Sequence, residues 1–236
     1  PDWAKDRDGK WMVCYLGTMS IITNNNEVKN PPKSFADILA GDYKVTVGDV
    51  TTASQAQHAI LATAYAMGGS IDNLQPAYDF WTKLAKAGRI DTGETSTARI
   101  ESGEIAVGLL WDYNALNYRD NAVKTNPSAS FTVCIPSDGS VQSGYASVIN
   151  INAPHPYAAC LAREYILSDA GQINLAKGYA TPIRSQYITI PDDVQAKRID
   201  SSEYKSAVAI KDFEKWSSVC QDIITYWQDN ILPLIK

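Results

Sequence analysis

Short apolar runs alternate with amphipathic segments along most of this chain. A short apolar run is typical of a buried strand, whereas apolar residues at three- and four-residue steps are typical of a helix. Strands are therefore expected over residues 11–23, 44–47, 105–111, 131–135 and 145–151. Helices are expected over residues 53–67, 76–86, 95–101 and 113–123, from Pro156 to about Leu167, and in a long final segment carrying Phe213, Trp216, Cys220, Ile223, Ile224 and Trp227. This alternation of strands and helices predicts an α/β protein.

Capping and turn residues set the expected ends of several elements. Ser34 and Asp37 have the spacing of a capping box and predict the start of a short helix. Asp169 and Gln172 have the spacing of a similar box and predict a second short helix. Residues 88–93 are bounded by glycines and are expected to form a loop.

The stretch Gly108-Leu-Leu-Trp-Asp-Tyr113 changes from apolar to polar-aromatic within a few residues. Its apolar part predicts a buried strand, and Trp111, Asp112 and Tyr113 follow at the carboxyl end. Ligands of open α/β sheets bind just beyond the carboxyl ends of strands. Aromatic rings stack on ligands and an acid fixes a cation or a hydroxyl, so this tip predicts a binding floor. A core position for Trp111 and general-base chemistry by Asp112 are the alternatives.

A second candidate site lies where the strand at residues 44–47 leads into the next helix. The connection over residues 48–54 is rich in small hydroxyl residues, including Thr52 and Ser54. A helix start of this kind leaves backbone N–H groups free to hold an anion or a ligand carboxylate. Ordinary capping of the helix by the same side chains is the alternative.

Other aromatic residues and carboxylates carry weaker signals. Tyr145 and Tyr179 each follow a glycine and are candidates for the walls of a site, with ordinary packing as the alternative. The sequence contains no G-x-S-x-G, P-loop, H-E-x-x-H or G-x-G-x-x-G signature. The pair Asp192-Asp193 is better explained as a solvated helix start than as acid–base machinery. A binding protein is therefore favoured over an enzyme.

Composition and charge narrow the functional classes further. The chain has 236 residues, of which 45% are hydrophobic and 20% charged, values typical of a soluble globular protein. The net charge of -5, without any basic cluster, argues against a nucleic-acid partner and suits a soluble monomer. Every apolar run is shorter than the roughly 18–20 residues needed to cross a bilayer. The chain starts at Pro1 with neither an initiator Met nor a signal peptide, as expected for a mature, processed or truncated form.

Cysteine and histidine are sparse and widely spaced. The four cysteines are Cys14, Cys134, Cys160 and Cys220. They form no C-x-x-C motif, so neither a zinc site nor a redox motif is expected. Four partly buried thiols are favoured, although two disulfides would also fit the even number. His58 and His155 leave little material for a metal site or a catalytic triad, and no metal or cofactor is expected.

Four segments together carry the pattern of a known family. The first runs from residue 11 through an Asn-rich turn to Pro-Pro-Lys-Ser-Phe-Ala-Asp-Ile-Leu and Gly-Asp-Tyr-Lys. Residues 102–113 fit a "GE…W" strand, residues 156–172 fit "P.AA..F..FLLS.EGQ", and residues 179–184 fit "Y.P.R". In this order, along nearly the whole chain, they resemble the extracellular solute-binding proteins of bacterial ABC importers. The branch is the one that serves polyamines, iron, thiamine and phosphonates.

The resemblance implies a two-lobed α/β fold of the periplasmic-binding-protein type II class, which closes on its solute by a hinge motion. Residues 1–20 would be the hinge strand and 21–143 the second lobe. Residues 144–190 would return to the first lobe, and 191–236 would pack on the second. The chain would then be mostly the second lobe and would lack most of the N-terminal lobe. A truncated form and a lobe supplied by a separate chain would each explain this difference.

Partners, location and some site residues follow from the same resemblance. The implied partners are a small-molecule solute and the subunits of an ABC permease. The implied location is the periplasm or the extracellular face, with a lipid anchor in a Gram-positive cell. Trp111 matches a cleft tryptophan of the polyamine binders, Asp49 a carboxylate position, and Tyr179 a "GY.TP" segment. Tyr145 matches less well, and the adjacent tyrosine pair of the iron binders is not visible, which disfavours ferric iron.

The candidate residues also indicate the charge of the solute. Asp49 and Asp112 favour an amine-bearing solute, and a zwitterion would in addition use the helix start at Thr52 and Ser54. A ligand-sensing domain of a transcription regulator and an enzyme on the same fold are the alternatives. A helix-turn-helix before Pro1 would identify the former, and turnover that depends on Asp112 would identify the latter.

Overall fold

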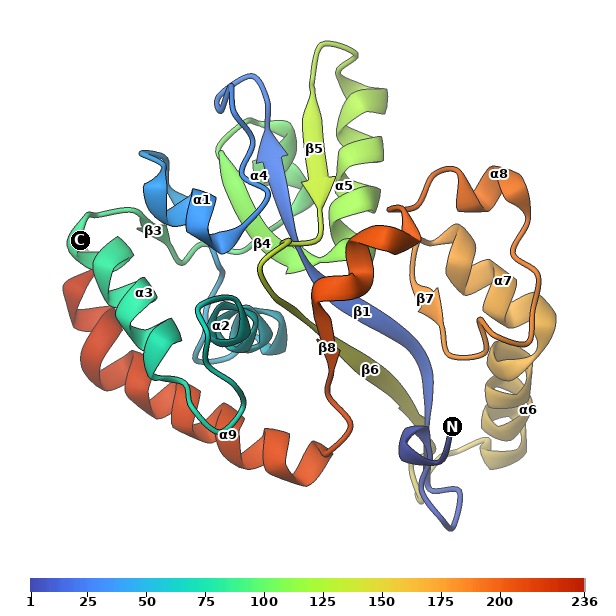
Figure 1. Cartoon of the computed structure of the whole chain (residues 1–236). Helices are drawn as coiled ribbons and strands as arrows, with labels where there is room; N and C mark the ends of the chain where they lie inside the picture. Colours follow the sequence, from blue (N-terminus) through green and yellow to red (C-terminus); the bar gives the residue numbers. More distant parts are fainter. Residues whose placement is uncertain (236) are drawn as a thin grey trace.

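The longest strand, β1 (Trp11–Asn24), runs through the middle of the molecule, and most of the sheet is attached to it (Figure 1). The computed structural model describes residues 1–235. The other strands are β2 (Val45–Thr46), β3 (Ile90–Asp91), β4 (Val107–Trp111), β5 (Phe131–Cys134), β6 (Ser140–Val148), β7 (Thr181–Pro182) and β8 (Ala207–Ala209). They form one mixed sheet in the order β3-β2-β4-β1-β6-β8, with β5 and β7 also paired to β1. The predicted α/β class is confirmed.

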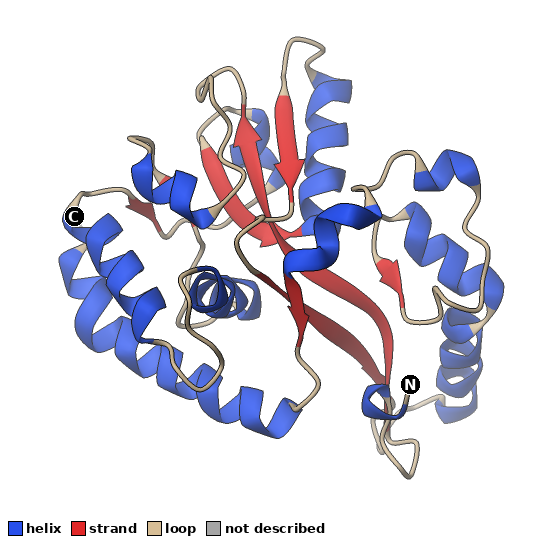
Figure 2. Cartoon of the chain, in the orientation of Figure 1, coloured by secondary structure: helices blue, strands red, loops and turns tan. Residues whose placement is uncertain are grey.

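The two ends of β1 have different neighbours. Its first part pairs with β6 up to Thr18 opposite Gln142, and briefly with β7. From Met19 onward it pairs with β4, and from Ile21 onward also with β5. The strand therefore changes partners on both edges near Thr18 and Met19. Figure 2 shows it as one continuous arrow between two groups of helices.

The helices gather on the two sides of this strand (Figure 1). They are α1 (Phe35–Ala40), α2 (Ser54–Ala66), α3 (Gln75–Lys86), α4 (Thr97–Glu101), α5 (Asp112–Thr125), α6 (Pro156–Leu167), α7 (Asp169–Lys177), α8 (Asp192–Gln195) and α9 (Phe213–Tyr226). Short 3-10 segments cover Asp2–Ala4, Ser201–Ser206 and Leu232–Leu234, and a π-helical turn covers Trp227–Ile231. Within residues 1–235, every helix is too short or too polar to cross a membrane.

Helix α2 lies at the centre of the main core. Its residues from Ala56 to Ala64 are all buried, because α3, α9 and the sheet surround it. An apolar helix without a polar face is stable only when it is covered on all sides. Trp81 of α3 and Trp227, just after α9, pack edge to face with ring centroids 5.7 Å apart and close this core.

One predicted cap is confirmed and another is wrong. The Ser34 side chain accepts a hydrogen bond from the Asp37 N–H and starts α1, as the sequence predicts. Helix α7 is capped by Ser168 rather than by Asp169. The Gln172 side chain is fully buried instead, where its amide donates to the Cys14 carbonyl oxygen at 3.0 Å.

Strand β6 begins five residues before the predicted start, at Ser140 rather than residue 145. Ser140 and Gln142 are polar and resemble loop residues in the sequence. The Ser140 hydroxyl donates to the Met19 carbonyl oxygen at 2.7 Å, and the Gln142 amide donates to the Thr18 hydroxyl at 3.0 Å. Contacts with a distant strand therefore satisfy these polar groups, which local periodicity does not reveal.

All four cysteines are free thiols. Cys14 and Cys134 are buried and Cys220 is half-buried, as the favoured expectation has it. Cys160 is exposed, contrary to that expectation, because α6 has no buried residue at all. Tyr157 and Leu161 on the same helix are 89% and 72% exposed.

Candidate ligand-binding site

Three parallel strands end at one edge of the sheet. Strand β2 pairs in parallel with β3 on one side and with β4 on the other. The segments that follow these strands therefore meet beyond their carboxyl ends, where ligands of α/β sheets bind. A cavity of about 560 Å³ lies there, within the usual size range of small-molecule sites. It is lined by Val47, Gly48, Asp49, Thr52, Ala53, Ser54, Gln55, Ala56, Thr92, Glu94, Thr95, Trp111, Asn114, Tyr118 and Tyr145.

The cavity contains five of the eight residues that sequence reasoning selects: Asp49, Thr52, Ser54, Trp111 and Tyr145. The first three come from the loop that leads into α2. Trp111 ends β4, and Tyr145 lies on β6. Two candidate regions that are far apart in sequence are thus one site in space.

Trp111 forms a wall of this cavity from within the core. Only 1% of its surface is exposed. Its ring lies 4.9 Å from the His58 ring and 6.0 Å from the Tyr145 ring. Its backbone N–H donates to the Gln55 side-chain oxygen at 3.1 Å, which ties the end of β4 to α2. Among residues 1–235 its indole N–H has no hydrogen-bond partner.

Asp49 makes its hydrogen bonds with the turn that follows it. One carboxylate oxygen accepts from the Thr51 N–H and hydroxyl at 2.8 and 2.6 Å, and the other accepts from the Thr52 hydroxyl at 2.8 Å. These bonds, the Thr51 hydroxyl first, lower the pKa of Asp49, so the group keeps its negative charge in weak acid.

The first turn of α2 has no side-chain cap. Ala53 occupies the cap position, so the alternative of ordinary side-chain capping does not hold. Within the described residues, the N–H groups of Ser54, Gln55 and Ala56 donate to no other group. Free donors and the positive end of the helix dipole therefore face the cavity that these residues line.

The other three predicted residues lie away from the cavity lining. Asp112 is fully buried and accepts hydrogen bonds from the Thr18 N–H at 3.0 Å and the Tyr204 hydroxyl at 2.8 Å. Tyr113 packs edge to face on Tyr145, with ring centroids 6.3 Å apart. The Tyr179 hydroxyl donates a hydrogen bond to the Asp120 carboxylate.

Several lining residues escape the sequence reasoning. They are Gln55, Thr92, Glu94, Thr95, Asn114 and Tyr118. Thr92, Glu94 and Thr95 follow β3, a strand of two residues inside the segment expected to be a loop. A strand this short leaves no periodicity, so its carboxyl end gives no signal. Asn114 and Tyr118 follow the Trp111 tip on α5 and could have been found from helical spacing.

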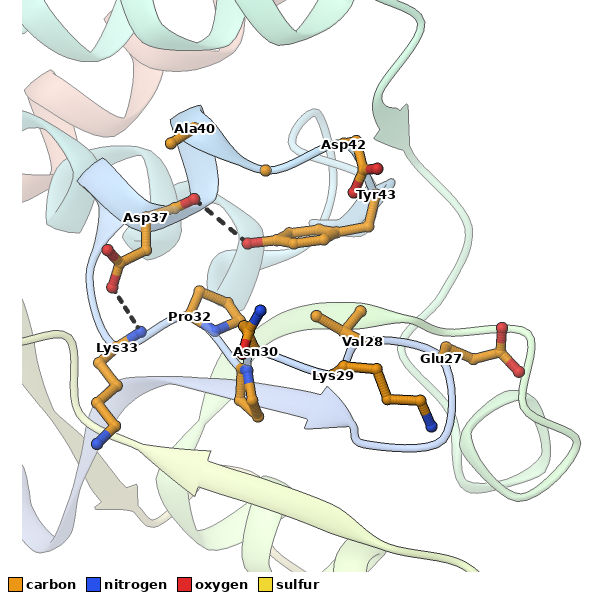
Figure 3. Close-up of a pocket in the computed structure, with 12 residues that line it drawn as sticks. Glu27, Val28, Lys29, Asn30, Pro32, Lys33, Asp37, Ala40, Asp42 and Tyr43 are labelled. Atoms are coloured by element: carbon orange, nitrogen blue, oxygen red, sulfur yellow. Dashed lines mark hydrogen bonds between the residues drawn. The ribbon is translucent and has the colours of Figure 1, made fainter.

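A second cavity of about 480 Å³ lies between the loop after β1 and the end of α1 (Figure 3). Two hydrogen bonds join residues of its lining. The Lys33 N–H donates to the Asp37 carboxylate at 2.9 Å, and the Tyr43 hydroxyl donates to the Asp37 carbonyl oxygen at 3.4 Å. Since this cavity lies away from the parallel strand ends, the cavity at β2, β3 and β4 is the better candidate. Residues 1–235 contain no cluster of three His, Cys, Asp or Glu side chains that could hold a metal.

A family model described as "Bacterial extracellular solute-binding protein" matches residues 1–219. A comparison with curated protein sequences found no match. The fold is also similar to that of several solved structures. One is the periplasmic binding protein AfuA from Actinobacillus pleuropneumoniae with exogenous fructose-6-phosphate bound, at 19% identity and a TM-score of 0.73. That match covers 96% of this chain and 70% of AfuA.

Two further solved structures show the same fold. The periplasmic binding protein P5PA is 18% identical with a TM-score of 0.72, over 95% of this chain and 70% of that one. A periplasmic thiamin binding protein is 17% identical with a TM-score of 0.69, over 100% of this chain and 70% of that one. These identities establish the fold and leave the solute open.

Proposed function

This chain belongs to the bacterial extracellular solute-binding protein family, and we propose that it captures a small polar solute in the cavity at the ends of β2, β3 and β4. The family implies a binding protein rather than an enzyme, acting outside the cytoplasm with the permease of an ABC importer. The observation that carries the proposal is the convergence of Trp111, the α2 start and Tyr145 on one cavity. We expect the protein to act as a monomer.

The proposed solute carries an amine, alone or in a zwitterion. The charged side chains in the cavity lining are Asp49 and Glu94, both acidic. The hydrogen bonds from Thr51 and Thr52 keep Asp49 ionised, so it can attract a cation. Tyr118 and Tyr145 offer aromatic surface in the same lining, which also suits an ammonium group. Asp112 takes no part in this proposal because it is buried elsewhere.

The proposed lobe boundaries follow the change of partners in β1. Residues 1–20 act as the hinge, 21–143 and the tail from 191 form the second lobe, and 144–190 belong to the first. The exposed face of α6 supports this assignment, because exposed Tyr157 and Leu161 are unusual for a helix with this many apolar residues. This face would pack against the remainder of a first lobe.

Ligand binding is expected to stabilise the protein without turnover. A solute at about a hundred times its Kd would add about 2.7 kcal/mol to the free energy of unfolding. Thermal-shift measurements across polyamines, aminophosphonates, amino acids and sugar phosphates would detect it. Tyr118→Ala should weaken the response because it removes a cavity wall, whereas Tyr157→Ala, on α6, should leave it unchanged. Uniformly flat responses, or a matching loss in both variants, would contradict the proposal.

The α6 face gives a second prediction, on thiol reactivity. Cys160 is exposed on α6, whereas Cys14 and Cys134 are 4% and 9% exposed. A maleimide reagent should therefore label Cys160 first in the native protein, as peptide mass spectrometry would show, and Cys160→Ser should remove the rapid phase. A polypeptide that packs on α6 should slow this labelling. Labelling of Cys160 no faster than that of Cys134 would contradict the prediction.

A further inference from the structure

Within the described part of the chain, one hydrogen bond ties the segment 144–190 directly to residues 21–143 of the second lobe. The Tyr179 hydroxyl donates to the Asp120 carboxylate on α5. The other hydrogen bonds that leave this segment, in the part of the chain that the structure describes, go to the hinge or to Arg198 in the tail. The Tyr179 bond is thus the polar contact by which the segment reaches the second lobe away from β1.

The tail divides between the two lobes. The Arg198 side chain donates to the Ala180 carbonyl oxygen at 2.8 Å, so the tail as far as Arg198 stays with the segment 144–190. Further along, the Tyr204 hydroxyl donates to Asp112 at 2.8 Å, in the second lobe. The tail therefore joins the second lobe only after Arg198. With this division, the bond of Tyr179 is the one hydrogen bond among the described residues that crosses between the lobes outside the hinge and the tail.

The backbone of Tyr179 has a conformation that glycine usually provides. Its φ is 70°, and within residues 1–235 every other positive φ belongs to a glycine. Tyr179 follows the end of α7, and its N–H donates to the Ala176 carbonyl oxygen at 2.9 Å. A left-handed residue at such a helix end is normally glycine, because a Cβ there is strained. Strain of this kind is kept at sites with a task, and here the side chain is held at its base by α7 and at its hydroxyl by α5.

The chemistry of this bond suits a lasting contact. Arg119 Nε donates to one oxygen of Asp120 at 2.7 Å, which leaves the other oxygen for the Tyr179 hydroxyl. Burial, and the Asp120 carboxylate beside it, raise the pKa of Tyr179 to about 12, so the hydroxyl keeps its proton at neutral pH. The ring also packs on a small apolar cluster, formed by Leu116, Ile135 and Ile199.

We propose that Tyr179 and Asp120 form a latch, a contact that holds the two lobes in the arrangement described here without any solute. The proposal rests on the proposed function, because it takes the lobes of a solute-binding protein as bodies that turn about β1. With the bond made, α5 is fixed to the end of α7 at a point away from that strand. With the bond broken, a bend near Thr18 and Met19, where β1 changes partners, separates the two.

The distance between two spin labels tests the latch. One label goes on the exposed Cys160 of α6, and the other on the thiol that Lys86→Cys adds at the exposed end of α3, on the other side of β1 (Figure 1). Cys220→Ser removes the half-buried thiol and keeps a donor for Gln57. The two remaining cysteines are buried and stay unlabelled.

Two matched variants are compared in this background. Tyr179→Phe removes the hydroxyl and keeps the ring on its apolar cluster. Tyr187→Phe is the control, because Tyr187 belongs to the same segment and is 73% exposed. Asp120→Ala breaks the same bond from its other side.

Double electron–electron resonance should show, for Tyr179→Phe, a population whose label distance differs by about 3 Å or more, as a bend of several degrees in a strand of this length produces. The ratio of the two populations should change about tenfold or more, as expected for a hydrogen bond to a charged group. Asp120→Ala should have the same effect, and combining it with Tyr179→Phe should add nothing, since both remove one bond. Tyr187→Phe should leave the distances unchanged.

Unchanged distances for Tyr179→Phe, or an equal change for Tyr187→Phe, would overturn the latch. The thermal-shift measurements with solutes keep this result apart from the proposed function. A flat response to every solute, together with the distance change, would count against solute capture alone. A positive response with unchanged distances would count against the latch alone.

Discussion

Asp112→Ala is expected to lower the free energy of unfolding by about 3–5 kcal/mol, because each buried donor left without an acceptor costs about 1–3 kcal/mol. The Asp112 carboxylate is fully buried. It accepts from the Thr18 N–H at 3.0 Å, the Tyr113 N–H at 2.9 Å and the Tyr204 hydroxyl at 2.8 Å. Urea denaturation at neutral pH, followed by tryptophan fluorescence, would measure the loss.

The reason for so large an effect is the position of Thr18. On this edge β1 pairs with β7 at Tyr15 and Leu16, and with β4 only from Met19 onward. The Thr18 N–H therefore faces a gap between two strands, and the Asp112 carboxylate fills that gap. Burial raises the pKa of Asp112 while these hydrogen bonds oppose the rise. The buried carboxylate and its three donors thus join β1 to the start of α5 and to Tyr204.

Two control variants make this prediction specific. Asp112→Asn keeps one oxygen that can accept from Thr18 and Tyr113, so its loss should be less than half that of the alanine variant. Asp42 is exposed, and Asp42→Ala should change stability by less than about 0.5 kcal/mol. A loss below about 1 kcal/mol for Asp112→Ala would show that the carboxylate does not hold this junction.

Acid is expected to destabilise the protein through His58, by about 3 kcal/mol between pH 7 and pH 4. His58 is buried between the rings of Trp111 and Trp216, whose centroids lie 4.9 and 4.2 Å away. Burial lowers its pKa from 6.5 to about 4. Its Nδ1 lies 2.7 Å from the Ser54 carbonyl oxygen, which can only accept, so Nδ1 carries the proton of the neutral ring.

The direction follows from the two pKa values. In the unfolded chain His58 takes up a proton as the pH falls below 6.5, whereas in the folded protein it stays neutral until about pH 4. Stability is thus fully present above pH 6.5 and is lost as the pH falls toward 4.

Variants separate this effect from the titration of carboxylates. His58→Gln has no titrating ring. Over the same pH range its free energy of unfolding should therefore fall by about 3 kcal/mol less than that of the native protein. His155 is exposed, and His155→Gln should follow the native curve. Parallel curves for the native protein and His58→Gln, measured by urea denaturation at each pH, would contradict the prediction.

The sequence predicts the helices and the long strands well because their signals are local. The sequence selects the Trp111 tip and the α2 start as candidates, since a strand that ends in aromatic and acidic residues and a hydroxyl-rich helix start are visible in a few residues. That they form one cavity depends on the parallel pairing of β2 with β4, which no local pattern encodes.

Asp112 shows where sequence reasoning reaches its limit. An acid beside Trp111 at a strand end has the same sequence signal whether it faces a solute or the interior. The choice depends on the Thr18 N–H, 94 residues earlier in the chain. The short strand β3 is a similar case, because two residues cannot show a period and the cavity wall that follows them stays hidden.

Strand β1 is continuous across the point where its partners change, so a bend at that point would displace its two halves relative to each other. At about 3.3 Å per residue, a strand of 14 residues is about 45 Å long, and its partner change near Thr18 lies close to the middle. A bend of about 10° at that point would move one half of the strand relative to the other by about 4 Å at its end, more than the length of one hydrogen bond. A small bend beside Asp112 would therefore be magnified at the ends of the strand, and a variant that loosens the Asp112 junction would be expected to let those ends move further.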